Sequence, residues 1–488
     1  MRQVEQMART PLDVVDSVVG GGLEHLNEAW HRRRLRRLGQ LEAMDPPGSG
    51  GWARTAGRPP REGNTLEVLV DGEQALPRIA EEVRQATSYV HIAGWHLEED
   101  FGLDRDRDPT PMRHLLAELA ERVEVRVLLW AGPPLPAFRP HRSELRRLQQ
   151  DLTRGTRVKC VLDAREFTMH CHHEKLVIID GRVAFVGGID LTTLQGDRYD
   201  RNGHPPREGI GWHDAASRLT GPAVTDVAEH FRSRWQEVAK EPLPAPEPQQ
   251  PTGRHTVQVV RTLPETYRFA PRGEFSLLES YVRALRSAER FIYLENQFLW
   301  STEIANILDE KLQDPPCDDF RILLVLPVRP NNGKDTTRGQ LGGMIQADDG
   351  GHRLLATTIR SGDDSGFGTC YVHAKIGIVD DRWLTLGSGN LNEHSLFNDT
   401  EVNVVCHDEE LARDTRLRLW AEHLEVPVEQ VSGEPCRVID EQWAPISVEQ
   451  LRRQEAGEPP THRLLALPGV SRRSGRLTGP LRGLLVDG

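Results

Sequence analysis

The chain carries the same segment twice. HEKLVIIDGRVAFVGGID (His173–Asp190) aligns without a gap with HAKIGIVDDRWLTLGSGN (His373–Asn390), and the offset between the copies is 373 − 173 = 200 residues. Upstream of each copy, the chain repeats the same order of an apolar strand pattern, a helical pattern and a second apolar strand. Alternating helices and apolar strands are typical of α/β folds. We therefore expect two similar α/β sandwich halves, with mixed β-sheets flanked by helices, packed about a pseudo-two-fold axis with one active site between them.

Two segments rich in proline divide the chain. They are DPPGSGGWARTAGRPPREGN at residues 45–64 and EPLPAPEPQQPTG at residues 241–253, and both have the composition of linkers. The expected organisation is an amino-terminal helical and flexible extension (1–64), a first half (65–240, with its motif region at about 167–194), a proline-rich linker (241–253), a second half (254–455, with its motif region at about 367–394) and a carboxy-terminal tail (456–488).

Composition disfavours several classes of protein. Lysine and arginine total 61 against 73 aspartates and glutamates, a formal net charge of −12, so no nucleic-acid partner is expected. The six cysteines form no CxxC pair, which indicates a reduced protein. The start MRQVEQMARTPLDVV lacks the apolar core of a signal peptide, and no stretch reaches the ~20 apolar residues of a membrane span. We expect a cytoplasmic monomer that sits at most peripherally on the inner face of a membrane.

The run HCHHEK (His170–Lys175) allows two kinds of site. Cysteine and histidine together are the ligands that zinc prefers. However, neighbours on a strand point to opposite faces, and the counterpart CYVHAK (Cys370–Lys375) does not keep the ligand set. We therefore expect neither a metal nor another cofactor here. What both copies share is His-x-Lys followed by Asp, and these residues are His173, Lys175, Asp180, His373, Lys375 and Asp380.

The repeated triplet has the residue types that chemistry at phosphorus requires. Residues two apart share a face of a strand, so each histidine projects with its lysine, and the axis would bring both pairs together. Lysines hold phosphate oxygens and stabilise charge that develops in the transition state. One histidine can attack phosphorus while the other protonates the leaving oxygen. Asp180 and Asp380 fall at an odd spacing, on a turn, so we expect them to anchor their hairpins by hydrogen bonds.

Each imidazole also needs an acceptor on its second ring nitrogen, which fixes its tautomer. Asp200 and Glu401 follow the two motifs at a similar distance, so we expect Asp200 to serve the first half and Glu401 the second. The segment Trp212–Asp214 (WHD) reads as the start of a structural strand. Glu295–Gln297 (ENQ) is a further candidate to reach the site.

The doubled HxKxxxxD motif resembles the phospholipase D superfamily. Further stretches are similar to phospholipase D proper, namely IYLENQFL (Ile292–Leu299), DRYD (Asp197–Asp200) and the run Trp212–Trp235 that begins with WHD. The resemblance covers roughly residues 65–430. It implies the two-halved α/β fold already expected from the duplication.

The resemblance also implies a role for each matching residue. His173 would be the nucleophile that forms a phosphohistidine, and His373 would be the general acid that later activates water. The residues that would hold or orient the phosphate are Lys175, Lys375, Ser388 and Asn390. Asp190 stands where the second half has Asn390, and its carboxylate would repel phosphate unless it is neutralised.

The activity that the resemblance implies is that of a phospholipase D. Such an enzyme cleaves the distal phosphodiester bond of a glycerophospholipid at a membrane surface, yielding phosphatidic acid and a free head-group alcohol, with phosphatidyl transfer to alcohols as a side activity. The alternatives are a cardiolipin synthase-like phosphatidyltransferase and a non-enzymatic phospholipid-binding relative.

Two terminal segments remain open. The basic helical pattern LEHLNEAWHRRRLRRLGQL (Leu23–Leu41) fits either a helix on an anionic lipid surface or a solvated helix packed on the body of the protein. The last residues, LTGPLRGLLVDG, could add an edge strand to a sheet.

Overall fold

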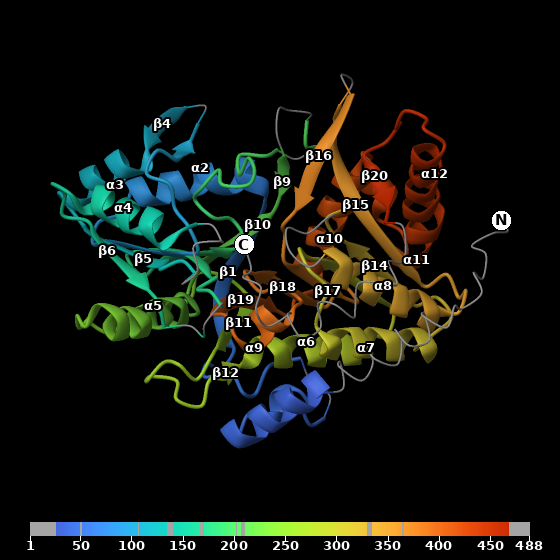
Figure 1. Ribbon diagram of the computed structural model, residues 1–488, viewed down its shortest axis with the longest axis horizontal. Helices are drawn as coiled ribbons and strands as arrows, with labels where there is room; N and C mark the ends of the chain where they lie inside the picture. The colour runs from blue at the N-terminus through green and yellow to red at the C-terminus, as the bar shows by residue number, and fades with distance from the viewer. Residues whose placement is uncertain are drawn as a thin grey trace.

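The computed structural model describes residues 26–48, 51–105, 107–133, 140–165, 167, 170–201, 203–205, 210–328, 334–363 and 366–467. Figure 1 shows two lobes side by side, each with its own sheet and its own outer helices. The expected α/β fold, with two halves built from mixed sheets flanked by helices, is confirmed.

The two sheets have the same strand order. Across the first sheet the strands are β1 (Arg61–Val70), β10 (Ala215–Thr220), β8 (Val183–Gly187), β7 (Lys175–Ile179), β2 (Tyr89–Gly94), β5 (Glu124–Trp130) and β6 (Lys159–Asp163). Across the second they are β11 (His255–Leu263), β19 (Glu401–Cys406), β18 (Trp383–Gly387), β17 (Ile376–Val379), β13 (Phe291–Glu295), β14 (Arg321–Val325) and β15 (Leu354–Asp363). In each sheet the last three strands run parallel and the other pairings are antiparallel, so the halves are equivalent strand by strand.

The remaining elements complete the two lobes. The shorter strands are β3 (Gly102–Asp104), β4 (Asp108–Pro111), β9 (Gly211–His213), β12 (Glu274–Phe275), β16 (Gly366–Val372) and β20 (Leu464–Ala466). The helices of the first half are α2 (Asp71–Arg84), α3 (Met112–Ala120), α4 (Arg142–Thr153) and α5 (Val224–Ala239). Those of the second half are α6 (Ser276–Ser287), α7 (Thr302–Gln313), α8 (Lys334–Asp348), α9 (Glu393–Phe397), α10 (Glu409–Leu424), α11 (Pro435–Val438) and α12 (Ala444–Glu455).

Apolar packing in the described part of the chain forms three large cores. An outer core lies between the first sheet and helices α2, α3 and α4, and its counterpart lies between the second sheet and helices α6, α7 and α8. The third core lies between the halves and includes side chains from both sheets and from α5 and α10. Strands with cores on both faces read as continuous apolar runs, which explains why β7 (KLVII) and β8 (VAFVG) are fully buried.

Each motif hairpin turns at two residues with left-handed backbone. Asp180 and Gly181 have φ of 53° and 66°, and Asp380 and Asp381 have φ of 54° and 52°. A two-residue turn with positive φ at both positions matches the right-handed twist of the strands it joins. Aspartate and glycine tolerate this conformation better than most residues, so the DG and DD pairs fit the turn.

Backbone hydrogen bonds also join the halves. β1 and β11 pair in antiparallel fashion, with Asn64 opposite His255. β9 and β16 pair in parallel, with Trp212 opposite Tyr371. The second pairing brings the WHD segment of the first half next to the second motif.

The amino-terminal helix, described over residues 26–38, packs on the second half, where Figure 1 shows it below α6 and α9. His31 stacks on Phe397 with ring centroids 3.8 Å apart and lies 2.7 Å from Glu303, and Arg34 pairs with Glu265 at 2.6 Å. The packed alternative is therefore what the structure shows for this face of the helix. Residues 23–25 of the predicted helix lie outside the described residues.

The carboxy-terminal segment adds a strand at the far edge of the second sheet. β20 pairs with β15, placing Leu465 opposite Thr358. This edge strand comes before the segment that the sequence suggested, because LTGPLRGLLVDG lies beyond the described residues. Across the described part of the chain, no helix combines the length and hydrophobicity needed to cross a membrane.

Candidate active site

The two motif histidines stand at equivalent places, just before β7 and β17. The backbone N–H of His173 donates to the carbonyl of Thr400 at 3.1 Å, and that of His373 donates to the carbonyl of His213 at 2.8 Å. Thr400 belongs to the second half and His213 to the first. Each motif is therefore held against a segment contributed by the other half.

Each imidazole also contacts a carboxylate that the opposite half supplies. Nδ1 of His173 lies 2.9 Å from Oε1 of Glu401, and Nδ1 of His373 lies 2.6 Å from Oδ2 of Asp214. The expected pairing was wrong in two respects. Glu401 serves the histidine of the opposite half, and Asp214, taken as structural, takes the place assigned to Asp200.

The strand pairing explains the error. Asp214 and Glu401 are equivalent because the residues two positions further on, Ala216 and Asn403, pair with Gly187 and Gly387 of the two hairpins. The constant offset of 200 ends at the motif, since 214 − 190 = 24 in the first half and 401 − 390 = 11 in the second. Asp200 lies among the extra residues of the first half. An alignment that keeps the constant offset of 200 places it next to the position of Glu401, although the two residues are not equivalent.

Asp200 instead orders the loop before β9. Its carboxylate accepts from the backbone N–H of Trp212 at 2.7 Å and of Arg201 at 2.9 Å, and it lies 3.2 Å from Nδ1 of His204. Glu401 is fixed more tightly, since the hydroxyls of Ser388 and Ser395 both donate to it. Ser388 therefore orients the carboxylate that holds His173.

The two lysines have different surroundings. Nζ of Lys175 lies 3.2 Å from Oδ2 of Asp190, which neutralises the carboxylate that the sequence left in doubt. Nζ of Lys375 instead donates to Oε1 of Gln297 at 3.2 Å, and the amide of Asn390 donates to the same oxygen at 3.3 Å. Of the ENQ segment, Gln297 thus reaches the site. All of these side chains are buried.

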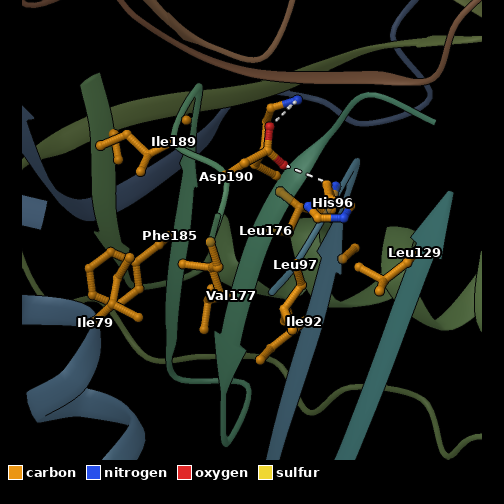
Figure 2. A pocket seen from close by; sticks show the side chains of 16 residues that line it. Ile79, Ile92, His96, Leu97, Leu129, Leu176, Val177, Phe185, Ile189 and Asp190 are labelled. Carbon is orange, nitrogen blue, oxygen red and sulfur yellow. Dashed lines mark hydrogen bonds and ion pairs between the residues drawn. The ribbon is translucent and has the colours of Figure 1, made fainter. Parts of the chain in front are cut away.

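Behind Asp190 lies a small cavity. Figure 2 shows Asp190 and His96 at one end of this space, with Ile92, Val177 and Phe185 further along its wall. The cavity is lined mostly by apolar side chains and has a volume of about 20 Å³. This volume is about enough for a single water molecule. A phospholipid head group does not fit there, so the cavity belongs to the core of the first half.

Burial and positive charge act together on the second dyad. Burial, followed by the charges of Lys375 and Arg198, holds the pKa of His373 well below its ordinary value. Burial raises the pKa of Asp214 to about 6, although Lys375 acts to lower it. An anion placed among these cations would raise the pKa of His373, because a nearby negative charge favours the imidazolium. The arrangement is thus suited to receiving an oxyanion.

Arg198 is a site residue that the sequence reasoning missed. It is buried, and its guanidinium carbon lies 3.4 Å from the ring centroid of Trp212, whose ring lies 4.9 Å from that of His373. Burial lowers the pKa of Arg198 to about 10, so the group remains a cation at neutral pH. The DRYD segment was the available signal, but only its last residue, Asp200, was predicted as a site residue.

The other three residues at the start of the HCHHEK run, His170–His172, have side chains in different surroundings. His170 lies 2.9 Å from Nδ1 of His394, Cys171 packs in an apolar cluster with Trp95 and Trp130, and His172 contacts Arg234. The three side chains have three different sets of neighbours. They do not form one ligand set with His173.

Asp180 and Asp380 lie at the other end of the hairpins, where the turn geometry placed them. Asp180 accepts from the backbone N–H groups of Thr87, Ser88 and Tyr89 at 2.7–2.9 Å. Asp380 accepts from those of Glu289, Arg290 and Phe291 at 2.7–2.8 Å. Burial alone would raise the pKa of Asp180, but the donated backbone hydrogen bonds lower it overall. Both carboxylates hold the start of a neighbouring strand.

Asp180→Asn and Asp380→Asn are therefore expected to lower the free energy of unfolding by ~1–3 kcal/mol each, because an amide leaves part of the donor set unsatisfied. Asparagine tolerates the left-handed backbone, so the exchange removes the charge and one acceptor oxygen without straining the turn. Asp349→Asn, at an exposed turn aspartate, is the control.

Chemical unfolding at two pH values measures the effect. Asp180 has a lowered pKa in the folded state, so its contribution is present above the unfolded value of about 3.9 and is lost as the pH falls through the folded value. The gap between the wild type and Asp180→Asn should accordingly shrink in acid. A variant that unfolds like the wild type yet has no activity would instead assign the carboxylate a direct part in the chemistry.

Comparison with known proteins gives consistent results. Residues 281–420 match a family model described as cardiolipin synthase, PLD-like domain. Phospholipase D A of Dictyostelium discoideum is 25% identical over 463 residues, which covers 75% of this chain and 36% of that protein. Phospholipase D alpha 3 of Arabidopsis thaliana is 25% identical over 594 aligned positions, covering 84% of this chain and 71% of the relative. The chain thus spans about a third of the length of the Dictyostelium protein.

Among solved structures, the phosphatidylserine synthase of Haemophilus influenzae Rd KW20 superposes with a TM-score of 0.51. The sequences are 13% identical, and the match covers 79% of this chain and 94% of that one. At this identity the likeness establishes a shared fold.

Proposed function

We propose, because the chain belongs to the phospholipase D superfamily, that it hydrolyses the distal phosphodiester bond of glycerophospholipids. The products are phosphatidic acid and a free head-group alcohol. The observation that carries the proposal is the pair of histidine–carboxylate dyads, His173–Glu401 and His373–Asp214, each made from both halves and each next to a buried lysine.

The dyads support a two-step reaction. Since Glu401 occupies Nδ1 of His173, Nε2 is the nitrogen that carries the lone pair toward substrate. Nε2 attacks phosphorus, the bond from phosphorus to the head-group oxygen breaks, and a phosphohistidine forms. Water then attacks phosphorus, the phosphorus–nitrogen bond breaks, and phosphatidic acid leaves. Lys175 and Lys375 neutralise the phosphate oxygens in both steps.

His373 supplies and recovers the proton. Bound phosphate raises the pKa of this imidazole from its depressed value, so that Nε2–H can protonate the departing alcohol oxygen. The resulting neutral imidazole takes a proton from the attacking water in the second step. Asp214 keeps the ring in the orientation that both transfers require.

A second candidate function is phosphatidyl transfer to a lipid alcohol. The phosphohistidine can be opened by an alcohol as well as by water, and the match to the cardiolipin synthase model supports this alternative. A purely binding relative is disfavoured, because His173, Lys175, His373 and Lys375 are all present and buried, and the charges of both lysines and of His173 act on His373.

Product analysis separates these possibilities. Purified protein is incubated with vesicles of mixed phospholipids, with and without ethanol, and the lipids are identified by mass spectrometry. We expect phosphatidic acid in water and phosphatidylethanol in its place when ethanol is present. Cardiolipin formed from phosphatidylglycerol would favour the transferase. Binding to vesicles without any new lipid would support the non-enzymatic relative.

We further propose that the protein acts as a monomer in the cytoplasm, peripherally on the inner face of a membrane. The amino-terminal helix supports contact with lipid, since it exposes Leu26 and Trp30 by 68% and 52% while Arg33, Arg36 and Arg37 are also exposed. Apolar and basic side chains on one exposed helix are typical of interfacial segments.

A further inference from the structure

Behind the His373–Asp214 dyad lies a second cluster of ionisable side chains. Asp71, His204, His213 and Glu422 each place one potential ligand atom so that all four atoms lie within 4.8 Å of one another. Asp71, His204 and His213 are fully buried, and the side chain of Glu422 is 9% exposed. We propose that these four residues form a structural site for a divalent metal ion of the zinc class.

The distances suit a tetrahedral ion. Nε2 of His204 lies 3.0 Å from Oε1 of Glu422 and 3.4 Å from Oδ2 of Asp71, and Nδ1 of His213 lies 3.1 Å from Oδ1 of Asp71. Ligands bonded at 2.0–2.1 Å in a tetrahedron are about 3.3 Å apart. Two imidazoles and two carboxylates are ligands that zinc accepts, and four protein ligands make a closed site without room for substrate.

Hydrogen bonding accounts for the contact between His213 and Oδ1 of Asp71, but not for the buried nitrogens of His204 or Oδ2 of Asp71. Both ring nitrogens of His204 and Oδ2 of Asp71 are buried without a hydrogen-bond partner, although carboxylate oxygens lie within 3.4 Å of the ring. Unsatisfied buried polar groups are rare because each costs free energy. A metal ion that accepts lone pairs would satisfy them in the positions they occupy.

The neighbours of the two imidazoles fit the same interpretation. Nε2 of His213 lies 2.6 Å from Oε2 of Glu295, and Nδ1 of His204 lies 3.2 Å from Oδ2 of Asp200. A histidine that binds a metal almost always donates its other ring N–H to a carboxylate, a carbonyl or water. For His213 this partner is Glu295, whereas the carboxylate of Asp200 lies close to Nδ1 of His204 without forming a hydrogen bond.

The ion pairs of the carboxylates also support a bound cation. Within the described residues, the ion pairs of Asp71, Glu295 and Glu422 all run to histidines. The first half has a comparable buried group, but there Arg234 pairs with both Asp163 and Glu174. No lysine or arginine of the described residues forms an ion pair with Asp71, Glu295 or Glu422, and a divalent cation would balance these carboxylates.

The position of the site suggests its effect. Asp71 begins α2, His213 ends β9 and Glu422 lies on α10, so an ion would connect both halves. Oδ1 of Asp71 also accepts from the backbone N–H of Asp214 at 3.0 Å. The metal would therefore stabilise the segment that carries Asp214 without touching the reacting atoms.

Elemental analysis tests the proposal independently of enzymatic activity. The protein is produced in zinc-supplemented medium and purified without a metal-affinity step. Its metal content is then measured by inductively coupled plasma mass spectrometry. We expect about one zinc ion per chain. Removing it with a strong chelator should lower the melting temperature by several degrees, and added zinc, but not magnesium, should restore it. A folded, zinc-free wild type whose melting temperature does not respond to zinc would overturn the proposal.

Variants locate the ion. His204→Gln and Glu422→Gln should both lose the bound zinc. Glu422 is the least buried of the four ligands, so Glu422→Gln keeps the test informative if His204→Gln fails to fold. Glu295→Gln, which changes only a neighbour of a ligand, should lower zinc affinity about 10–100-fold. Glu303→Gln is the matched control, because Glu303 is a buried carboxylate paired with His31 in another part of the molecule. Full zinc content in both ligand variants would show that the metal lies elsewhere and would reject this site.

Discussion

Replacing His173 with alanine is expected to abolish turnover, because no phosphohistidine can form without its imidazole. His373→Ala should lower kcat on natural phospholipids by at least ~10²–10⁴-fold, the usual contribution of general acid–base catalysis. Initial rates on a short-chain phospholipid measure both effects. His91→Gln is the control, since His91 is a buried histidine stacked between Tyr89 and Phe231 at the Asp180 end of the sheet.

A labelling experiment identifies the nucleophile. A substrate with a p-nitrophenol leaving group needs no general acid for its departure, so His373→Ala should form the phosphoenzyme and hydrolyse it slowly. Quenching with denaturant at alkaline pH, followed by peptide mapping, should place the label on the peptide that contains His173. Label on the peptide with His373 in the wild type would reverse the two roles.

Asp214→Asn is expected to have the second-largest effect. An amide can offer its N–H to Nδ1 and so stabilise the wrong tautomer, and the equivalent change in a serine protease costs about 10⁴-fold in kcat. We expect a loss on the order of 10²–10⁴-fold for Asp214→Asn, with Glu401→Gln acting similarly through His173. Asp197→Asn is the control, because Asp197 lies in the nearby DRYD run and pairs with Arg105.

The two steps of the reaction distinguish the variants. With the p-nitrophenyl substrate, Glu401→Gln should slow the burst of p-nitrophenol, whereas Asp214→Asn should spare the burst and slow the later hydrolysis. Asp200→Asn tests the hypothesis drawn from the sequence, and the structure predicts an unchanged burst because Asp200 contacts Trp212 and His204. A lost burst in Asp200→Asn alone would restore the original pairing with His173.

The features that could be predicted from the sequence are those that short, local residue patterns determine. Apolar runs and DG or DD turns define the two hairpins, and the gapless copy of the motif reveals the duplication. The same patterns identified the ENQ segment (Glu295–Gln297) as a candidate to reach the site. These features depend on residues close together in the chain, where strand periodicity and turn chemistry are readable.

The carboxylate pairing was not predictable in this way. It depends on contacts across the two halves and on residues 191–213, which extend the first half beyond the length of the second. Without strand registers, Asp200 and Asp214 are both acidic residues downstream of a motif. The cluster of Asp71, His204, His213 and Glu422 was equally hidden, since four distant segments supply it.

The exchange of carboxylates between halves has a consequence for the history of this chain. After a gene duplication, two copies are ordinarily free to diverge, because either one can retain the original task. Here Glu401 orients His173 and Asp214 orients His373, so neither copy contains a complete dyad of its own. A change in one copy is therefore selected through its effect on the other, and the two copies must be inherited, expressed and preserved as one unit.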